Sequence, residues 1–263
     1  MLSHTEIETI QQFDADADTF PYDRGEAKYT GCCKDTKRPY IEALAEHILS
    51  KPVVLFSDEM LKGKKTRVLK DKFTNGHDEQ ALDEALSDSS KDGEKMMVRQ
   101  WVKDLKVFPS LGKCFEYELN LVANKKTNID LLTYREGVIY LVEVKGSKNR
   151  KSNSEPDGLL KAVLEIATYQ EMLKQHLATF KEQVTVSPMA KRAFGEPTKL
   201  VIKDVRLAVL IPNYGPAFET WQALGNTSEY PHLIKLIRTY GVEVVVYDAT
   251  TFDEITQSPL PKD

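Results

Sequence analysis

The sequence predicts an α/β protein in which helices flank a mixed central β-sheet and an α-rich segment precedes it. Apolar residues recur at helical spacing over 93–106 and again over 159–180. Between these stretches lie apolar runs typical of strands, and beyond them strand-like and helical runs alternate up to residue 249. We therefore expect, from residue 93 onward, a helix, three strands, a helix, a strand, a helix and a strand.

The first part of the chain is harder to interpret. We treat 1–92 as an N-terminal extension, a possible specificity or docking region, and 93–263 as the core domain. Residues 1–37 are polar and turn-rich, so no regular structure is predicted there. A helical pattern covers 40–50, and the apolar run 52–56 is compatible with a strand.

The core strands follow from local pattern. Strand-like runs occupy 114–123, 128–134 and 138–145. Glu136-Gly137, between the second and third runs, suits a two-residue hairpin turn because glycine accepts the positive φ that such turns demand. Farther on, we expect a strand over 204–212, a helix over 231–241 and a strand over 242–249.

The expected hairpin has a calculable register. If Arg135 pairs with Val138 across the turn, Asp130 faces Glu143. Side chains alternate along a strand, so Lys145 shares a face with Glu143. Directly opposite Cβ atoms lie about 5 Å apart. The sequence therefore predicts two carboxylates and a lysine at one end of an apolar strand pair.

Such a cluster is suited to metal chemistry. Facing carboxylates destabilise a sheet unless a cation compensates them, and Mg²⁺ (or Mn²⁺) commonly takes one or two protein carboxylates with water and phosphate oxygens. A metal held by Asp130 and Glu143 could polarise a phosphodiester and activate water, while Lys145 stabilised the developing charge or oriented the water. The alternative is an exposed strand end at which Lys145 merely pairs with an acid.

The segment NIDLLTYREGVIYLVEVKG resembles the core of the PD-(D/E)XK, or restriction-endonuclease-like, nuclease superfamily. The resemblance covers about 93–249 and implies an αβββαβ core. It also implies metal-dependent hydrolysis of DNA or RNA, with Asp130 and Glu143 as metal ligands and Lys145 as the catalytic lysine. Ile129 stands where the name-giving proline is expected.

Two weaker correspondences add candidates. Glu94, at the start of the first core helix, is similar to the glutamate that completes the metal site in many members, although an ordinary helix-start glutamate is equally compatible. EIATYQEML resembles the QLxxYxxxL element of RecB-like nucleases. Tyr169 matches that element, and Glu165 stands where glutamine is expected.

The long helix supplies further candidates. On a helical wheel Gln170 falls in the middle of an apolar face formed by Leu159, Val163, Ile166, Leu173 and Leu177. Gln170 is either a satisfied core amide or a catalytic residue that reaches the active end of the sheet. Tyr169, at the edge of this face, and Lys161, beyond it, are candidate substrate-binding residues. The basic loop at 148–151 is a candidate phosphate clamp or a solvated loop.

Composition limits the partners. The net charge of −4 means that nucleic acid, with DNA favoured over RNA, must be bound by a local basic surface. The basic stretch 62–72 has a pattern that is more typical of a solvated face than of a nucleic-acid contact. No apolar run approaches the roughly 20 residues that span a bilayer, and a secretory signal is not evident, so we expect a cytoplasmic protein without membrane contact. A homodimer or a larger complex stays open.

Other function classes are disfavoured. The three cysteines, two of them adjacent, form no zinc or disulfide pattern and are too few for a four-cysteine iron–sulfur cluster. A GxSxG element that would indicate a serine hydrolase is lacking. The expected function is a Mg²⁺-dependent nuclease. The alternative is a catalytically inactive nucleic-acid-binding or regulatory subunit on the same fold.

Overall fold

The structure of the 263-residue chain is a computed structural model that describes residues 2–24, 31–61, 77–87, 93–121, 127–146, 158–196, 200–225 and 228–255. At its centre the described residues form a seven-stranded sheet whose spatial order follows the chain. Its strands are β1 (Val107–Phe108), β2 (Gly112–Asn120), β3 (Asn128–Arg135), β4 (Val138–Val144), β5 (Asp204–Pro212), β6 (Val242–Tyr247) and β7 (Glu254–Ile255). The sheet is mixed: β4, β5 and β6 run parallel, and the remaining neighbours are antiparallel.

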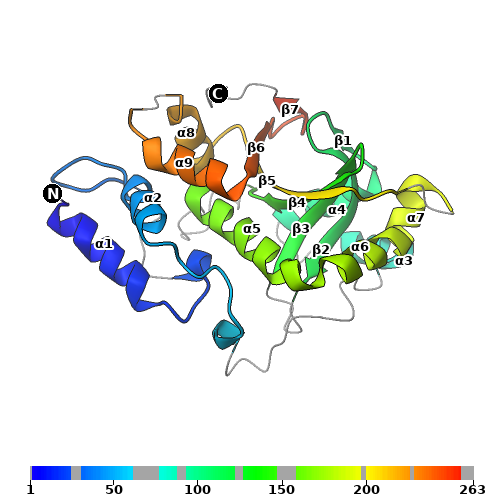
Figure 1. The fold of residues 1–263 in the computed structure, drawn as a ribbon. Helices are drawn as coiled ribbons and strands as arrows, with labels where there is room; N and C mark the ends of the chain where they lie inside the picture. Colours follow the sequence, from blue (N-terminus) through cyan, green and yellow to red (C-terminus); the bar gives the residue numbers. More distant parts are fainter. Residues whose placement is uncertain are drawn as a thin grey trace.

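Helices cover both faces of the sheet, which confirms the predicted α/β class. The helices are α1 (His4–Ala15), α2 (Tyr40–Ser50), α3 (Glu79–Ser87), α4 (Gly93–Lys103), α5 (Leu159–Leu173), α6 (Leu177–Val186), α7 (Pro188–Phe194), α8 (Pro216–Ala223) and α9 (Pro231–Tyr240). Short 3₁₀ turns are η1 (Pro21–Asp23), η2 (Asp58–Leu61) and η3 (Lys174–His176). In Figure 1, α5 crosses the near side of the sheet and α4 lies on the opposite side.

Strand alternation creates two cores. Leu132 and Leu141 face α5 and join a cluster that also contains residues of α2 and α9. Leu131 and Val142, one position along, face α4 and pack near Trp101. Because β4 is buried on both sides, its sequence VIYLVEV is almost continuously apolar.

The β3–β4 hairpin has the predicted register. Its ladder runs from Arg135↔Val138 to Leu131↔Val142. Glu136 and Gly137 both have positive φ, 51° and 96°, as a type I′ turn requires. This turn matches the right-handed twist of the strands and fixes which residues face each other.

Two predicted helices end earlier than expected. α4 stops at Lys103 rather than 106, because Leu105 adopts a left-handed φ of 50° and Lys106 N–H turns back to the Trp101 carbonyl. The helix expected over 159–180 ends at Leu173, after which η3 leads into a separate helix, α6.

The N-terminal segment differs most from expectation. α1 forms where no regular structure was predicted, and it begins with a capping box in which Ser3 and Glu6 bond reciprocally. The strand considered for 52–56 is wrong: this stretch is irregular, although Leu55 and Phe56 pack against the core. Both the N-terminal segment and the later helices therefore contribute to one apolar core.

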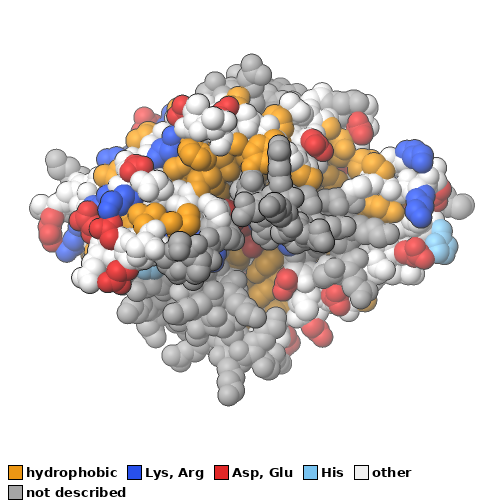
Figure 2. Space-filling model, turned by 180° about the vertical axis from the view of Figure 1, so that it is seen from behind, with side chains coloured by type: hydrophobic (Ala, Val, Ile, Leu, Met, Phe, Trp, Pro, Cys, Tyr) orange, Lys and Arg blue, Asp and Glu red, His pale blue; other side chains and the backbone are white. Residues whose placement is uncertain are grey.

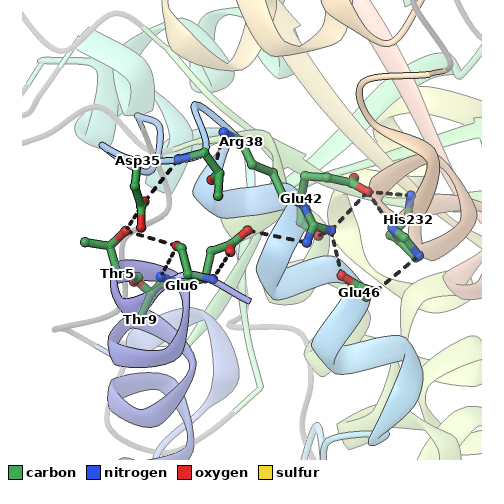
Figure 3. A network of polar contacts seen from close by, with 10 residues as sticks. Thr5, Glu6, Thr9, Asp35, Arg38, Glu42, Glu46 and His232 are labelled. Carbon is green, nitrogen blue, oxygen red and sulfur yellow. Dashed lines mark hydrogen bonds and ion pairs between the residues drawn. The ribbon is translucent and has the colours of Figure 1, made fainter. Parts of the chain in front are cut away.

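Polar contacts tie α2 to α9, which lie side by side. The buried Glu42 carboxylate accepts hydrogen bonds from the backbone N–H groups of His232 and Leu233, each at 3.0 Å, at the start of α9. Figure 3 shows the contact of Glu42 with His232. Arg38 lies 3.7 Å from Glu42 and 2.7 Å from Glu46. Glu42 thus satisfies helix-end donors of α9 from a neighbouring helix.

The outer strands also contact each other through side chains. Ser110, just after β1, donates its backbone N–H to Glu254 of β7 at 2.8 Å, and Figure 1 shows β1 and β7 close together despite their opposite places in the strand order. Among the described helices, none has both the length and the apolar character to cross a membrane.

Candidate active site

The β3–β4 ladder stops one pair short of two acidic residues. Hydrogen-bonded and non-hydrogen-bonded pairs alternate in an antiparallel ladder, so the next hydrogen-bonded pair after Leu131↔Val142 would be Ile129↔Val144. Instead, Val144 N–H donates to Asp130 Oδ2 at 2.9 Å. The Asp130 side chain therefore takes the place of a main-chain acceptor, and its carboxylate is held at the end of the hairpin.

Lys145 lies between carboxylates from a strand and a helix. Its Nζ donates to Glu143 Oε1 at 2.6 Å and to Glu165 Oε2 at 3.0 Å. Lys145 is 9% exposed and Glu143 is 3% exposed, so this ion pairing is largely shielded from solvent. The Lys145 carbonyl accepts a hydrogen bond from Tyr247 OH at 3.2 Å, which anchors the backbone beneath the ammonium.

Helix α5 contributes two residues to this cluster. Glu165 and Tyr169 stand one turn apart, and Tyr169 OH donates to Glu165 Oε1 at 2.8 Å. Sequence reasoning had treated Glu165 only as a departure from a family motif. Its position one turn before Tyr169, in an element already aligned with a nuclease motif, was the signal that could have identified it.

Glu94 reaches the same strand end from α4. Gly146 N–H donates a short hydrogen bond to Glu94 Oε2. A Cβ on Gly146 would stand 2.9 Å from Glu94 Cβ, so the close approach requires glycine. The negative charge of Glu94 also raises the pKa of Asp130.

Burial separates the pKa values of the acids. Burial, followed by the charge of Glu94, raises the pKa of Asp130 to about 7. Burial and then the charges of Asp130 and Glu165 raise the pKa of Glu143 well above its usual range. For Glu165 the positive charge of Lys145 and several hydrogen bonds outweigh burial and lower the pKa. The cluster therefore favours the ionised form of Glu165 more than that of Glu143.

The oxygen atoms left over fit a hard divalent cation. Glu143 Oε2 is buried and has no hydrogen-bond partner among the described residues. Asp130 uses Oδ2 for Val144 and has Oδ1 available. In the described part of the chain no three His, Cys, Asp or Glu side chains are already arranged around a common position. Mg²⁺ commonly takes only one or two protein carboxylates, so Asp130 and Glu143 would supply enough ligands of the type that this cation prefers.

The remaining candidate residues lie on α5. Gln170 is half-buried, and its side chain makes no hydrogen bond to any described residue, so it is not part of the Lys145 network. Lys161 is half-buried in the first turn of α5. Tyr169 is 2% exposed, which makes it an interior group that holds Glu165. The basic stretches 62–72 and 148–151 both lie outside the described residues.

On the face of the molecule in Figure 2, the described Lys and Arg side chains do not gather into one patch. They are scattered among acidic side chains, and hydrophobic side chains gather across the upper middle. Comparisons of the chain with models of protein families, with curated proteins and with solved structures each found no match.

Proposed function

We propose that this protein is a metal-dependent nuclease that hydrolyses phosphodiester bonds in DNA, or alternatively in RNA, on a PD-(D/E)XK-like core. The observation that carries the proposal is the convergence of Asp130, Glu143 and Lys145 at one buried strand end. Burying such groups together is costly, and shifted acids beside a lysine in one place are typical of catalytic sites.

The order of elements supports the core assignment. α4, β2, β3, β4, α5 and β5 occur in the chain order of an αβββαβ core, with the two-residue β1 inserted after α4 and with η3, α6 and α7 inserted before β5. The acids lie where β3 and β4 diverge, and α4 and α5 each contribute a carboxylate, Glu94 and Glu165. A site built at the junction of these elements holds its charged groups on rigid supports.

Mg²⁺ or Mn²⁺ held by Asp130 and Glu143 would polarise the phosphate and lower the pKa of a bound water. The protein's own groups do the rest. Lys145 Nζ places a positive charge where a phosphate oxygen gains negative charge during attack. Val144 N–H orients the Asp130 carboxylate, and Glu94 holds the Gly146 backbone beside it.

The test is incubation of the purified protein with labelled single- and double-stranded DNA and RNA, in Mg²⁺, Mn²⁺ or EDTA. We expect cleavage of at least one substrate in metal and none in EDTA. Asp130→Asn should abolish cleavage. Asp104→Asn should not, because Asp104 is an exposed aspartate that directly follows the C-terminal end of α4. Metal-independent cleavage, or equal cleavage by Asp130→Asn, would contradict the proposal.

One observation favours a second candidate, a binding or regulatory subunit without catalysis. The Lys145 ammonium is already paired with Glu143 and Glu165, so its charge is compensated by described side chains before any metal binds. Such a protein would retain nucleic acid in a gel-shift assay and leave it intact in every metal condition. The same incubation therefore separates the two candidates.

A further inference from the structure

The main chain of Lys145 lies where the parallel ladder between β4 and β5 passes a proline. The Lys145 N–H donates to the Leu210 carbonyl at 2.9 Å, which extends the ladder one residue beyond β4. In a parallel ladder the Lys145 carbonyl should next accept the N–H of residue 212, two positions after Leu210. Residue 212 is a proline, which has no N–H to donate. The sequence of β5 therefore leaves the Lys145 carbonyl without its expected main-chain partner.

Tyr247 of β6 provides a donor in place of this N–H. Its hydroxyl donates to the Lys145 carbonyl at 3.2 Å in a buried hydrogen bond. Tyr247 is paired with Pro212 in the ladder between β5 and β6, so its side chain starts beside the proline and reaches past β5 to β4. Asn213 N–H donates to the Tyr247 carbonyl at 2.9 Å, which fixes the backbone from which this side chain departs. A side chain of β6 thus replaces a main-chain donor of β5.

The ring of Tyr247 is packed independently of its hydroxyl. Trp101 of α4 meets the ring edge to face, with ring centroids 5.3 Å apart, and the centroid of Phe252 lies 6.4 Å away. Tyr247 is buried in the core on this side of the sheet. Removing only the hydroxyl should therefore leave the ring in its place.

The Lys145 carbonyl and the Gly146 N–H belong to one peptide group. Such a group is planar and trans, so its oxygen and its hydrogen point in opposite directions and turn together. Tyr247 binds the oxygen, and Glu94 of α4 accepts the hydrogen bond from Gly146 N–H on the other side. The orientation that Tyr247 gives to this peptide group therefore also directs the Gly146 N–H toward Glu94.

The same contacts fix the backbone of Lys145 on both sides. Its N–H is bonded to Leu210 and its carbonyl to Tyr247. A lysine side chain is a flexible stem with rotatable bonds, so a fixed backbone restricts the positions that its ammonium can reach. In the structure that ammonium lies 2.6 Å from Glu143 Oε1, within the candidate site.

We infer that Tyr247 is a positioning residue of the candidate active site. It orients the Lys145–Gly146 peptide group, which sets both the backbone of the catalytic lysine and the N–H that binds Glu94. β6 lies outside the series from α4 to β5 that supports the core assignment, so an additional strand contributes to the site. The positioning rests on the described hydrogen bonds, and only its effect on cleavage rests on the proposed nuclease function.

The direct test is the backbone amide signal of Gly146 in NMR spectra recorded in EDTA. Tyr247→Phe keeps the ring and removes the hydroxyl. We expect the Gly146 signal to shift and its amide hydrogen to exchange with solvent on the order of 10-fold faster. Tyr134→Phe is the matched control, because Tyr134 OH also donates to a backbone carbonyl, that of Val201, at 3.2 Å, but at the turn end of the hairpin. The control should leave the Gly146 signal unchanged.

A second substitution separates the lost hydrogen bond from a general loss of packing. Pro212→Ala gives residue 212 an N–H at the position where the parallel ladder directs it to the Lys145 carbonyl. Combined with Tyr247→Phe, it should restore the parental signal and exchange rate of Gly146. A role of Tyr247 in packing alone predicts no such restoration, because Pro212→Ala adds nothing to the contacts of the ring.

Two results would overturn the inference. One is a Gly146 signal and exchange rate in folded Tyr247→Phe that match those of the parental protein. The other is a double variant that keeps the altered exchange of Tyr247→Phe while Pro212→Ala alone behaves like the parental protein. Should Tyr247→Phe fail to fold, the double variant decides: folding with the parental Gly146 signal supports the inference, and failure to fold while Pro212→Ala folds overturns it.

Kinetics measure the consequence for cleavage. With Mg²⁺ and a labelled DNA oligonucleotide, Tyr247→Phe should lower kcat on the order of 10-fold with little change in KM, and Pro212→Ala should restore most of the loss. A parental kcat in Tyr247→Phe would overturn the role in catalysis. If the parental protein cleaves nothing, the proposed function fails, and the Gly146 comparison still decides the positioning by itself.

Discussion

The most direct test of the site without a substrate is Asp130→Asn. Burial and the charge of Glu94 raise the pKa of Asp130 from 3.8 to about 7 in the folded protein. Between these values the folded state binds one proton more than the unfolded state, so the free energy of unfolding falls as pH rises from about 4 to about 7. Above that range the folded protein carries the full cost of the charge.

The magnitude follows from the shift. Each pKa unit corresponds to about 1.4 kcal/mol, so a shift of about three units limits the cost to about 4 kcal/mol at pH 8. Asparagine is neutral at every pH, and its amide oxygen can still accept the hydrogen bond from Val144 N–H. Asp130→Asn should therefore be more stable than the parental protein at pH 8 by about 2–4 kcal/mol in EDTA, and the difference should shrink as the pH falls until the two are nearly equal at about pH 4.

The assay is urea denaturation at several pH values in EDTA and in Mg²⁺. A cation that binds only the folded protein stabilises it by about 2.7 kcal/mol at a concentration of 100 times Kd, so Mg²⁺ should stabilise the parental protein at pH 8 and not the variant. Asp104→Asn is the control for loss of one negative charge. A variant that is less stable than the parental protein at pH 8 in EDTA would refute the account of Asp130 as a buried, destabilising charge.

Three further changes test other parts of the structure. Lys145→Met keeps the apolar stem and removes the ammonium, so cleavage should slow by about 10²- to 10³-fold while circular dichroism stays unchanged; parental cleavage rates would make Lys145 structural. Glu42→Ala leaves the N–H groups at the start of α9 without their acceptor, and urea denaturation should show a loss of about 2–4 kcal/mol, whereas Glu8→Ala on the exposed side of α1 should cost little. Gly146→Ala places a methyl group against Glu94, so Mg²⁺ affinity measured by calorimetry should fall, and an unchanged affinity would show that this contact does not support the site.

Local pattern was enough for much of the sheet. β5 and α2 have the predicted bounds, because an apolar run or a helical repeat can be recognised from the residues of that one element. The hairpin register could be calculated since the Glu136-Gly137 turn fixes it over a few residues. For that reason Asp130, Glu143 and Lys145 could be proposed from the sequence.

The sequence also contains a local signal for α1. Ser3 and Glu6 have the spacing of a capping box, and α1 begins there. The run 52–56 shows the opposite limit. Its composition permits a strand, but a strand forms only by pairing with a neighbour. In the structure this segment belongs to no strand of the sheet, and its apolar side chains pack on the core instead.

The sequence by itself determined the mixed α/β sheet, the hairpin and the three residues that it carries, because these depend on neighbours along the chain. Only the tertiary structure decided that Glu165, rather than Gln170, turns toward Lys145, since the packing of α5 sets which side of the helix meets the strand end. The same holds for Glu94 against Gly146 and for Tyr22 against Tyr169, which are far apart in sequence. Such contacts have no local signature, because they form only when separate elements are packed around one core.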